Sequence, residues 1–267
     1  MNFLADLQWL VAIIGGFLAG GINVMVGAGT LISFPLLVLS GVPPLTATIA
    51  NTMGLVPASA TGVVAYRDEL RRLRGVIRTL LPASILGGAT GALLLLGFPA
   101  GVFVKVVPWL VAVGTALVLA GPSIRGWVAS RRDAEADEPS SHGVFTSRRA
   151  MVGGVIGCYL VGSYGGYFSA AQGILLVGLL GIVTHLGMQD LNAIKNFNVL
   201  FVNAMSAGMV LLVSPELINW KLAGLVAVGA ALGGLTGGRF AKRLSPRALR
   251  IFVVTVGVTT TLAMLLR

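Results

Sequence analysis

The chain of 267 residues is 56% hydrophobic and only 10% charged, with a mean hydropathy of +0.92. Soluble domains carry roughly 25% charged residues, so this composition excludes a soluble globular protein and predicts an all-α polytopic membrane protein. The formal net charge of +10 does not indicate nucleic-acid binding, because the basic residues stand in short clusters between apolar runs. Such clusters are typical of the cytoplasmic loops that orient a membrane protein.

Ten apolar segments follow one another, most of them close to the ~20 residues that cross a bilayer as a helix. The first five fall at about 7–26, 30–41, 45–65, 75–97 and 103–120, and a polar, charged stretch follows at 121–149. The last five fall at about 149–163, 167–186, 190–213, 219–238 and 248–266. We therefore predict about eight to ten transmembrane or half-membrane helices. They would form an N-terminal repeat (1–120), a cytoplasmic linker loop (121–149) and a C-terminal repeat (150–267).

Short similarities connect the two halves. GGFLAG at 15–20 matches GGVIGC at 153–158, and ILGGATGAL at 85–93 matches ALGGLTGGR at 231–239, 146 residues later. Between them, an offset of 144 residues places Gly29 on Gly173 and the segment 45–65 on 189–209. The order and spacing of these matches predict two homologous halves.

Loop charges predict that the halves lie upside down relative to each other. The loop 66–78 holds five arginines and its counterpart 214–221 a single lysine, whereas 98–105 holds one lysine and 239–250 five basic residues. The excess of Lys and Arg marks the cytoplasmic side. We therefore expect a multi-pass protein of a bacterial inner membrane with the loops 66–78, 121–149 and 239–250 in the cytoplasm and a periplasmic N-terminus. Inverted repeats are typical of secondary transporters.

Glycines interrupt the second segment of each half. The segment 30–41 is too short for a ~30 Å hydrocarbon core and follows Gly27-Ala28-Gly29. The second half carries Gly165-Gly166 and then Gln172-Gly173 in the corresponding region. Broken helices at matching places of two halves favour a binding site at the breaks, while close helix packing is the alternative for each glycine alone. We expect Gly27, Gly29, Gln172 and Gly173 to contribute to that site, and Asn23 either to line it or to bond a neighbouring helix.

A polar stripe runs along the segment 190–213. At about 100° per residue, one face carries Asn192, Lys195, Asn196, Asn203 and Ser206, whereas Asn198 lies off it and is expected to serve packing. The corresponding face of the first half carries Thr48, Asn51, Thr52 and Ser59. Polar stripes on apolar helices face the protein interior or a wet cavity. A cavity between these stripes offers hydroxyl and amide donors, one cation and no carboxylate, which suits an oxyanion.

The residues of this predicted site also allow simpler interpretations. Lys195 could reach the headgroups instead of a ligand, and each asparagine alone could bridge two helices. The sequence does not choose between the two roles of Lys195.

Two stretches resemble a known family. GFLAGGINVMVGAGTLISFPLLVLSGVPPLTATIANT (16–52) is similar to the N-terminal signature of the TauE/SafE sulfite exporter family, also called the toluene sulfonate uptake permease family. GSYGGYFSAAQGILLVGLL (162–180) is similar to its second-half copy. Gly27-Ala28-Gly29 stands where the family often has three consecutive glycines. The resemblance implies a bacterial inner-membrane transporter of small anions such as sulfite, sulfonates or sulfoacetate-like compounds.

Three other functions compete with a carrier. An intramembrane hydrolase could use Ser163 and His185, but the required Gly-x-Ser-Gly spacing is not met. An anion channel would favour rings of equivalent groups, and a scaffold would leave the buried amides unexplained. No metal, phosphate-loop or dinucleotide motif is present, so we expect no enzyme activity, metal or cofactor. We expect a small organic or inorganic anion and the lipid bilayer as partners and no nucleic acid, and a homodimer stays open.

Overall fold

The computed structural model describes residues 3–135, 144–240 and 246–266, and all regular secondary structure in these ranges is helical. The first half contains α1 (Phe3–Val26), α2 (Thr30–Leu39), α3 (Pro44–Ala65), α4 (Arg67–Arg72), α5 (Arg74–Gly97) and α6 (Ala100–Glu135). The second half contains α7 (Arg148–Tyr167), α8 (Gln172–Val183), α9 (Met188–Val213), the short 3-10 helix η1 (Pro215–Leu217), α10 (Trp220–Phe240) and α11 (Pro246–Leu265). The prediction of an all-α polytopic membrane protein is confirmed.

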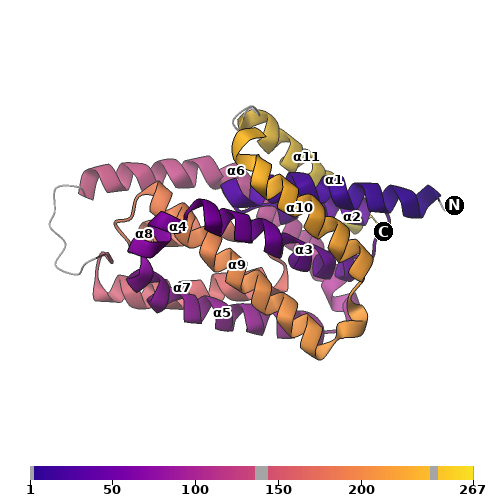
Figure 1. The fold of residues 1–267 in the computed structure, drawn as a ribbon, viewed down its shortest axis with the longest axis horizontal. Helices are drawn as coiled ribbons and strands as arrows, with labels where there is room; N and C mark the ends of the chain where they lie inside the picture. The colour runs from indigo at the N-terminus through magenta and orange to yellow at the C-terminus, as the bar shows by residue number, and fades with distance from the viewer. Residues whose placement is uncertain (1–2, 136–143, 241–245, 267) are drawn as a thin grey trace.

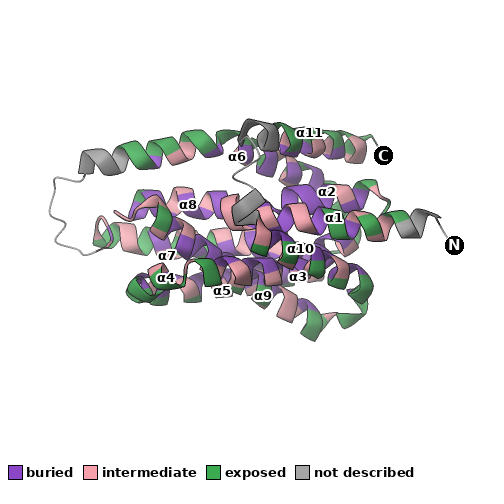
Figure 2. Cartoon of the chain, turned by 45° about the horizontal axis from the view of Figure 1, so that its top comes forward, coloured by how far each residue is buried: buried purple, intermediate pink, exposed green. Residues whose placement is uncertain are grey.

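Within the described residues, four helices are long and apolar enough to cross a membrane: Leu7–Val26, Arg74–Gly97, Ala100–Ser130 and Met188–Val213. The helices α2 and α8, with 10 and 12 residues, are about 15 and 18 Å long and cannot cross a ~30 Å hydrocarbon core. Both are almost entirely buried by their neighbours (Figure 2). Their burial places irregular backbone next to them inside the protein, where lipid does not reach it.

The helices of the two halves interlock (Figure 1). The first helix of each half packs along the helix of the other half's fourth predicted segment, so that α1 lies against α10 and α7 against α5. In the same way α3 packs on α10 and α9 on α5, while α3 meets α9 and α6 meets α11. Exchanging the helices of one half for those of the other leaves this set of neighbours unchanged. Two equivalent repeats would produce such a pattern, but whether the halves are inverted repeats stays a prediction.

Glycines allow the backbones at both long interfaces to approach closely. A Cβ on Gly16, Gly20, Gly229 or Gly233 would overlap backbone atoms across the α1–α10 interface, and one on Gly87, Gly91, Gly162 or Gly166 would do so between α5 and α7. Small residues serve this purpose in membrane helix pairs.

The two glycine interfaces correspond residue by residue, in a register that differs from the predicted one. Gly87 and Gly91 on α5 hold the positions of Gly229 and Gly233 on α10, whereas the sequence match pairs 85–93 with 231–239, one helical turn later. Because α10 carries glycines at 229, 233 and 237, similarity alone cannot select the register.

Two predicted boundaries were also wrong. The helix α6 continues into the predicted loop as far as Glu135 and contains Gly121, Pro122 and Gly126, residues that membrane helices tolerate in their interior. The loop's remaining residues 136–143 lie outside the described ranges. The helix α7 runs through Gly165-Gly166, where a break was expected, because both glycines pack in the helix against neighbouring atoms.

Candidate functional site

The two helix breaks meet inside the protein. The first break lies between α1 and α2 and contains Gly27, whose φ of +77° suits glycine. The second lies between α7 and α8, where Ser169 and Ala171 take φ values of 63° and 55°. The N–H of Gly173 donates to the carbonyl of Gly27 at 3.1 Å, and a Cβ on either residue would overlap the other's backbone. Gly27 is therefore the residue of the first break that meets Gly173.

Gly29, two residues after Gly27, packs against α1. A Cβ there would overlap the carbonyl of Ala19 and the side chain of Asn23, so this glycine allows α2 to pack closely against α1. This close contact holds α2, the helix after the first break, against α1.

In the first half, hydrogen bonds hold the polar stripe in place. Asn51, fully buried on α3, donates from Nδ2 to Thr30 Oγ1 at 3.0 Å and accepts at Oδ1 from the Ser33 hydroxyl. Asn23 Nδ2 on α1 donates to Ser59 Oγ on α3 at 3.1 Å. These bonds satisfy both polar atoms of the Asn51 amide and connect α3 to α1 and α2.

The second half repeats one of these bonds with other residues. Ser169 Oγ, in the break between α7 and α8, donates to Asn203 Oδ1 on α9 at 3.1 Å. Ser169 follows Asn23 by 146 residues, and Asn203 follows Ser59 by 144. Ser206 Oγ adds a bond of 2.9 Å to the carbonyl of Gly166. Each half therefore has a hydrogen bond between the vicinity of its break and its polar stripe.

Lys195 is buried with its charge pointing inward. Its relative exposure is 0%, and it is the only charged side chain that is buried among those the structure describes. Nζ donates to the carbonyl of Val24 at 3.0 Å, in the last turn of α1, where the helix dipole favours a cation. No carboxylate of the described residues lies within 4.0 Å of Nζ. In this structure Lys195 does not extend to the headgroups, so that alternative is not realised.

A second cation, Arg125, lies at the same helix end. Its Nη2 donates to the carbonyl of Met25 at 3.3 Å, and it is close enough to Lys195 and Tyr66 to interact electrostatically with both. Burial and the Glu69 carboxylate raise the pKa of the Tyr66 phenol, so this residue is protonated at neutral pH. Arg125 was not predicted as a site residue because residue 125 was expected to lie in a loop. No local signal in the sequence indicates otherwise, because Gly121, Pro122 and Gly126 interrupt the helix-forming residues around it.

Several buried donors around the breaks have no partner in the described structure. They are Thr48 Oγ1 on α3, Gln172 Nε2 on α8, and Asn196 Nδ2 and Asn203 Nδ2 on α9. More than nine in ten buried polar groups in proteins are paired, so a set of unpaired donors indicates a place for water or a ligand. The helices that carry them pack against one another, α3 on α9 and α8 on α9. Each donor therefore lies on a helix that packs against another helix with such a donor.

The remaining stripe residues contribute less directly. Thr52 is buried, and Asn192 is half-buried in the first turns of α9, where its Nδ2 donates to the Met188 carbonyl of the same helix. Asn198, expected to lie off the stripe, is buried and donates to Ile194 O at 3.0 Å. Neither Asn192 nor Asn198 offers a free amide donor.

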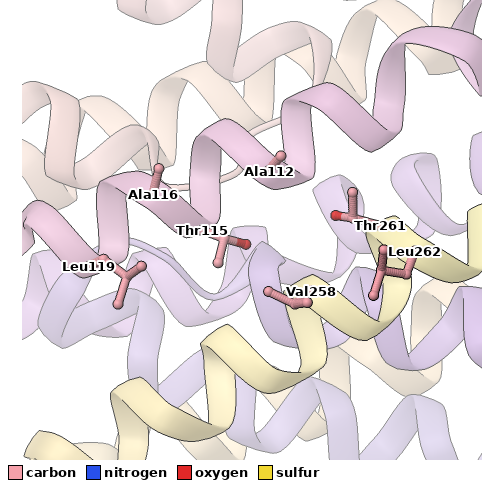
Figure 3. Close-up of a pocket in the computed structure, with 7 residues that line it drawn as sticks. All are labelled: Ala112, Thr115, Ala116, Leu119, Val258, Thr261 and Leu262. Carbon is pink, nitrogen blue, oxygen red and sulfur yellow. The ribbon is translucent and has the colours of Figure 1, made fainter. Parts of the chain in front are cut away.

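Two features of the structure lie apart from this site. Ser163 Oγ donates to the carbonyl of Tyr159 in its own helix at 2.9 Å, which is not the contact with a base that a nucleophile needs. A pocket of about 240 Å³ between α6 and α11 is lined by mostly apolar side chains (Figure 3). The hydroxyls of Thr115 and Thr261 at this pocket already donate to carbonyls of their own helices.

A family model matches nearly the whole chain. The model of the family described as sulfite exporter TauE/SafE matches residues 12–264, which include both breaks and both stripes. The chain belongs to the TauE/SafE family. It is therefore related to membrane transporters, and the resemblance of residues 16–52 and 162–180 to the family's two signatures is confirmed.

Curated proteins named as probable membrane transporters are similar to the chain over most of their length. A "probable membrane transporter protein ORF9" from Sinorhizobium sp is 24% identical over 94% of this chain and 90% of its own. A "probable membrane transporter protein" from Haemophilus influenzae is 24% identical over 93% of this chain and 91% of its own. The "probable membrane transporter protein YfcA" of Escherichia coli K12 is 24% identical over 95% of this chain and 86% of its own. No solved structure matches the chain significantly.

Proposed function

We propose that this membrane transporter is a secondary carrier that moves a small sulfur-containing oxyanion, such as sulfite, a sulfonate or a sulfoacetate-like compound, across the bacterial inner membrane. The anion would bind where the two breaks and the stripes of α3 and α9 meet. Family membership supports the class of protein, and the family's description supports the class of substrate.

The observation that carries the proposal is the set of unpaired donors beside a buried, uncompensated cation. Thr48, Gln172, Asn196 and Asn203 each have a free donor, and Lys195 supplies positive charge. Tetrahedral oxygens accept several such bonds at once, and a charge-assisted bond is about twice as strong as a neutral one. The acidic side chains whose burial is described (Asp68, Glu69, Asp190 and Glu216) are exposed or half-buried residues at helix ends. None of them would repel an anion bound between the stripes.

Alternating access fits the packing better than a channel. The first helix of each half lies on the helix of the other half's fourth predicted segment, α1 on α10 and α7 on α5, with glycines at both contacts. Two interlocked halves can rock against each other around a site at their interface, as in other carriers with inverted repeats. The inverted orientation and the cytoplasmic location of the loops 66–78 and 121–149 belong to this proposal.

Uptake into proteoliposomes tests both the substrate and the mechanism. The panel should contain sulfite, sulfate, sulfoacetate, taurine and thiosulfate, with protein-free liposomes as the blank. We expect saturable uptake of at least one sulfur oxyanion, with turnover well below channel rates. A current that rises linearly with anion concentration would support a channel instead. Absence of uptake for the whole panel, in protein that remains folded, would overturn the substrate class.

A further inference from the structure

A groove on the surface combines arginines with exposed apolar side chains. It has a volume of about 600 Å³ and lies beside α4, where the end of α3, the start of α5 and α9 come together. Four arginines line it: Arg67, Arg71, Arg74 and Arg78. All four are exposed, and they belong to the loop region predicted to be cytoplasmic.

Two of the four arginines have no counter-ion among the described residues. Arg67 and Arg71 share the Asp68 carboxylate at 3.9 and 3.8 Å, so part of their charge is compensated. Neither Arg74 nor Arg78 has a carboxylate of the described residues within 4.0 Å. Four residues apart on α5, these two side chains lie on the same face of the helix. Together they present two neighbouring guanidinium groups to an anion.

The other wall of the groove is apolar and accessible. Val64, in the last turn of α3, is 66% exposed, and Val63 and Phe197 are partly exposed next to it. Phe197 packs on the ring of Phe201 with the ring centroids 4.7 Å apart, which continues this wall along α9. Orientation of the protein in the membrane requires only the number of arginines, not an apolar wall beside them. A ligand that uses both walls must be amphiphilic.

We propose that this groove binds one anionic phospholipid of the surrounding leaflet. Its phosphate accepts hydrogen bonds from the guanidinium groups of Arg74 and Arg78, and an acyl chain covers Val63, Val64 and Phe197. Guanidinium groups bind phosphate oxygens in a bidentate manner, and basic pockets between membrane helices are suited to anionic headgroups. The proposal does not depend on which anion the protein transports.

Native mass spectrometry of the detergent-purified full chain provides the test, with phosphatidylglycerol, phosphatidylcholine and inorganic phosphate as separate probes. We expect one phosphatidylglycerol bound in preference to phosphatidylcholine. Removing both charges in the double variant Arg74→Gln/Arg78→Gln should weaken phosphatidylglycerol binding about 10- to 30-fold. The control Arg148→Gln/Arg149→Gln removes two exposed charges at the start of α7 and should stay within about twofold of the wild type.

A third variant tests the apolar wall. Val64→Asn, at an exposed position, should weaken phosphatidylglycerol binding about threefold because part of the acyl contact is lost. Equal binding of both lipids by the wild type, or unchanged phosphatidylglycerol binding by the Arg74/Arg78 variant, would overturn the proposal. Displacement of the lipid by millimolar inorganic phosphate would also overturn it, because the groove would then be a site for small anions.

Discussion

The polar stripes of α3 and α9 occupy corresponding places in the two halves but are in different states. On α3 the Asn51 amide is saturated by Thr30 and Ser33, so the stripe mainly connects helices. On α9 the Nδ2 atoms of Asn196 and Asn203 have no partner among the described residues, and none of these residues places a carboxylate within 4.0 Å of Lys195 Nζ. The α3 stripe keeps one free donor, Thr48 Oγ1, whereas the α9 stripe keeps two amide donors and a buried lysine. We therefore expect most of the proposed binding capacity on α9.

Replacement of Lys195 should have the largest effect on anion uptake. Replacement by glutamine removes the buried charge, and we expect uptake of the transported anion to fall about 30- to 100-fold, the factor for one lost charged hydrogen bond. Lys221→Gln is the matched control, because this lysine is exposed and lies over the Trp9 ring, 4.0 Å from its centroid. Its uptake should stay within about twofold of the wild type. Equal uptake by the two variants would remove Lys195 from the site.

The second-largest effect is expected for a variant on α3, which should lower the stability of the protein. Asn51→Ala leaves Thr30 and Ser33 without their partner, and we expect the free energy of unfolding to drop by about 2 kcal/mol. Thermal unfolding in detergent measures this change. The α9 variant Asn196→Ala removes an amide donor that has no partner and should shift the same midpoint very little. If Asn196→Ala destabilises the protein as much as Asn51→Ala, the distinction between the two stripes fails.

The smallest effects test whether the two halves correspond. Ser59→Ala removes the partner of Asn23, and Ser169→Ala removes the partner of Asn203. Each should lower the free energy of unfolding by about 1 kcal/mol, the typical value for one hydrogen bond between membrane helices. Denaturant titration of the two single variants and the double variant compares them. A loss in one variant and none in the other would contradict the equivalence of these bonds.

The sequence predicted the polar stripe of α9 well because helical periodicity is a local property. Four of its five members, Lys195, Asn196, Asn203 and Ser206, are buried as expected. Asn192 is the exception, since in the first turns of α9 its amide bonds to its own helix. The short, glycine-interrupted segments also predicted a helix break in each half, although α7 continues through Gly165-Gly166 to Tyr167.

Other features depend on packing that the sequence does not encode locally. Arg125 reaches the end of α1 only because α6 continues past Pro122, and Gly27 meets Gly173 only because the halves interlock. The register between α5 and α10 was off by one turn because several glycines are spaced by four residues. The sequence also could not show that both polar atoms of the Asn51 amide are hydrogen-bonded, because the partners Thr30 and Ser33 lie on a different helix.

Two neighbouring asparagines of α9 offer the most direct test of the proposed anion site. Asn196 and Asn198 are both buried, but Asn196 Nδ2 is free whereas Asn198 Nδ2 donates to Ile194 O. The measurement is kcat/KM for uptake of the preferred sulfur oxyanion by Asn196→Ala and Asn198→Ala in proteoliposomes, with folded protein verified for both. If Asn196 Nδ2 binds the anion, kcat/KM should fall about tenfold for Asn196→Ala and less than twofold for Asn198→Ala. Equal losses in both variants, or no loss in Asn196→Ala, would contradict an anion site on this stripe.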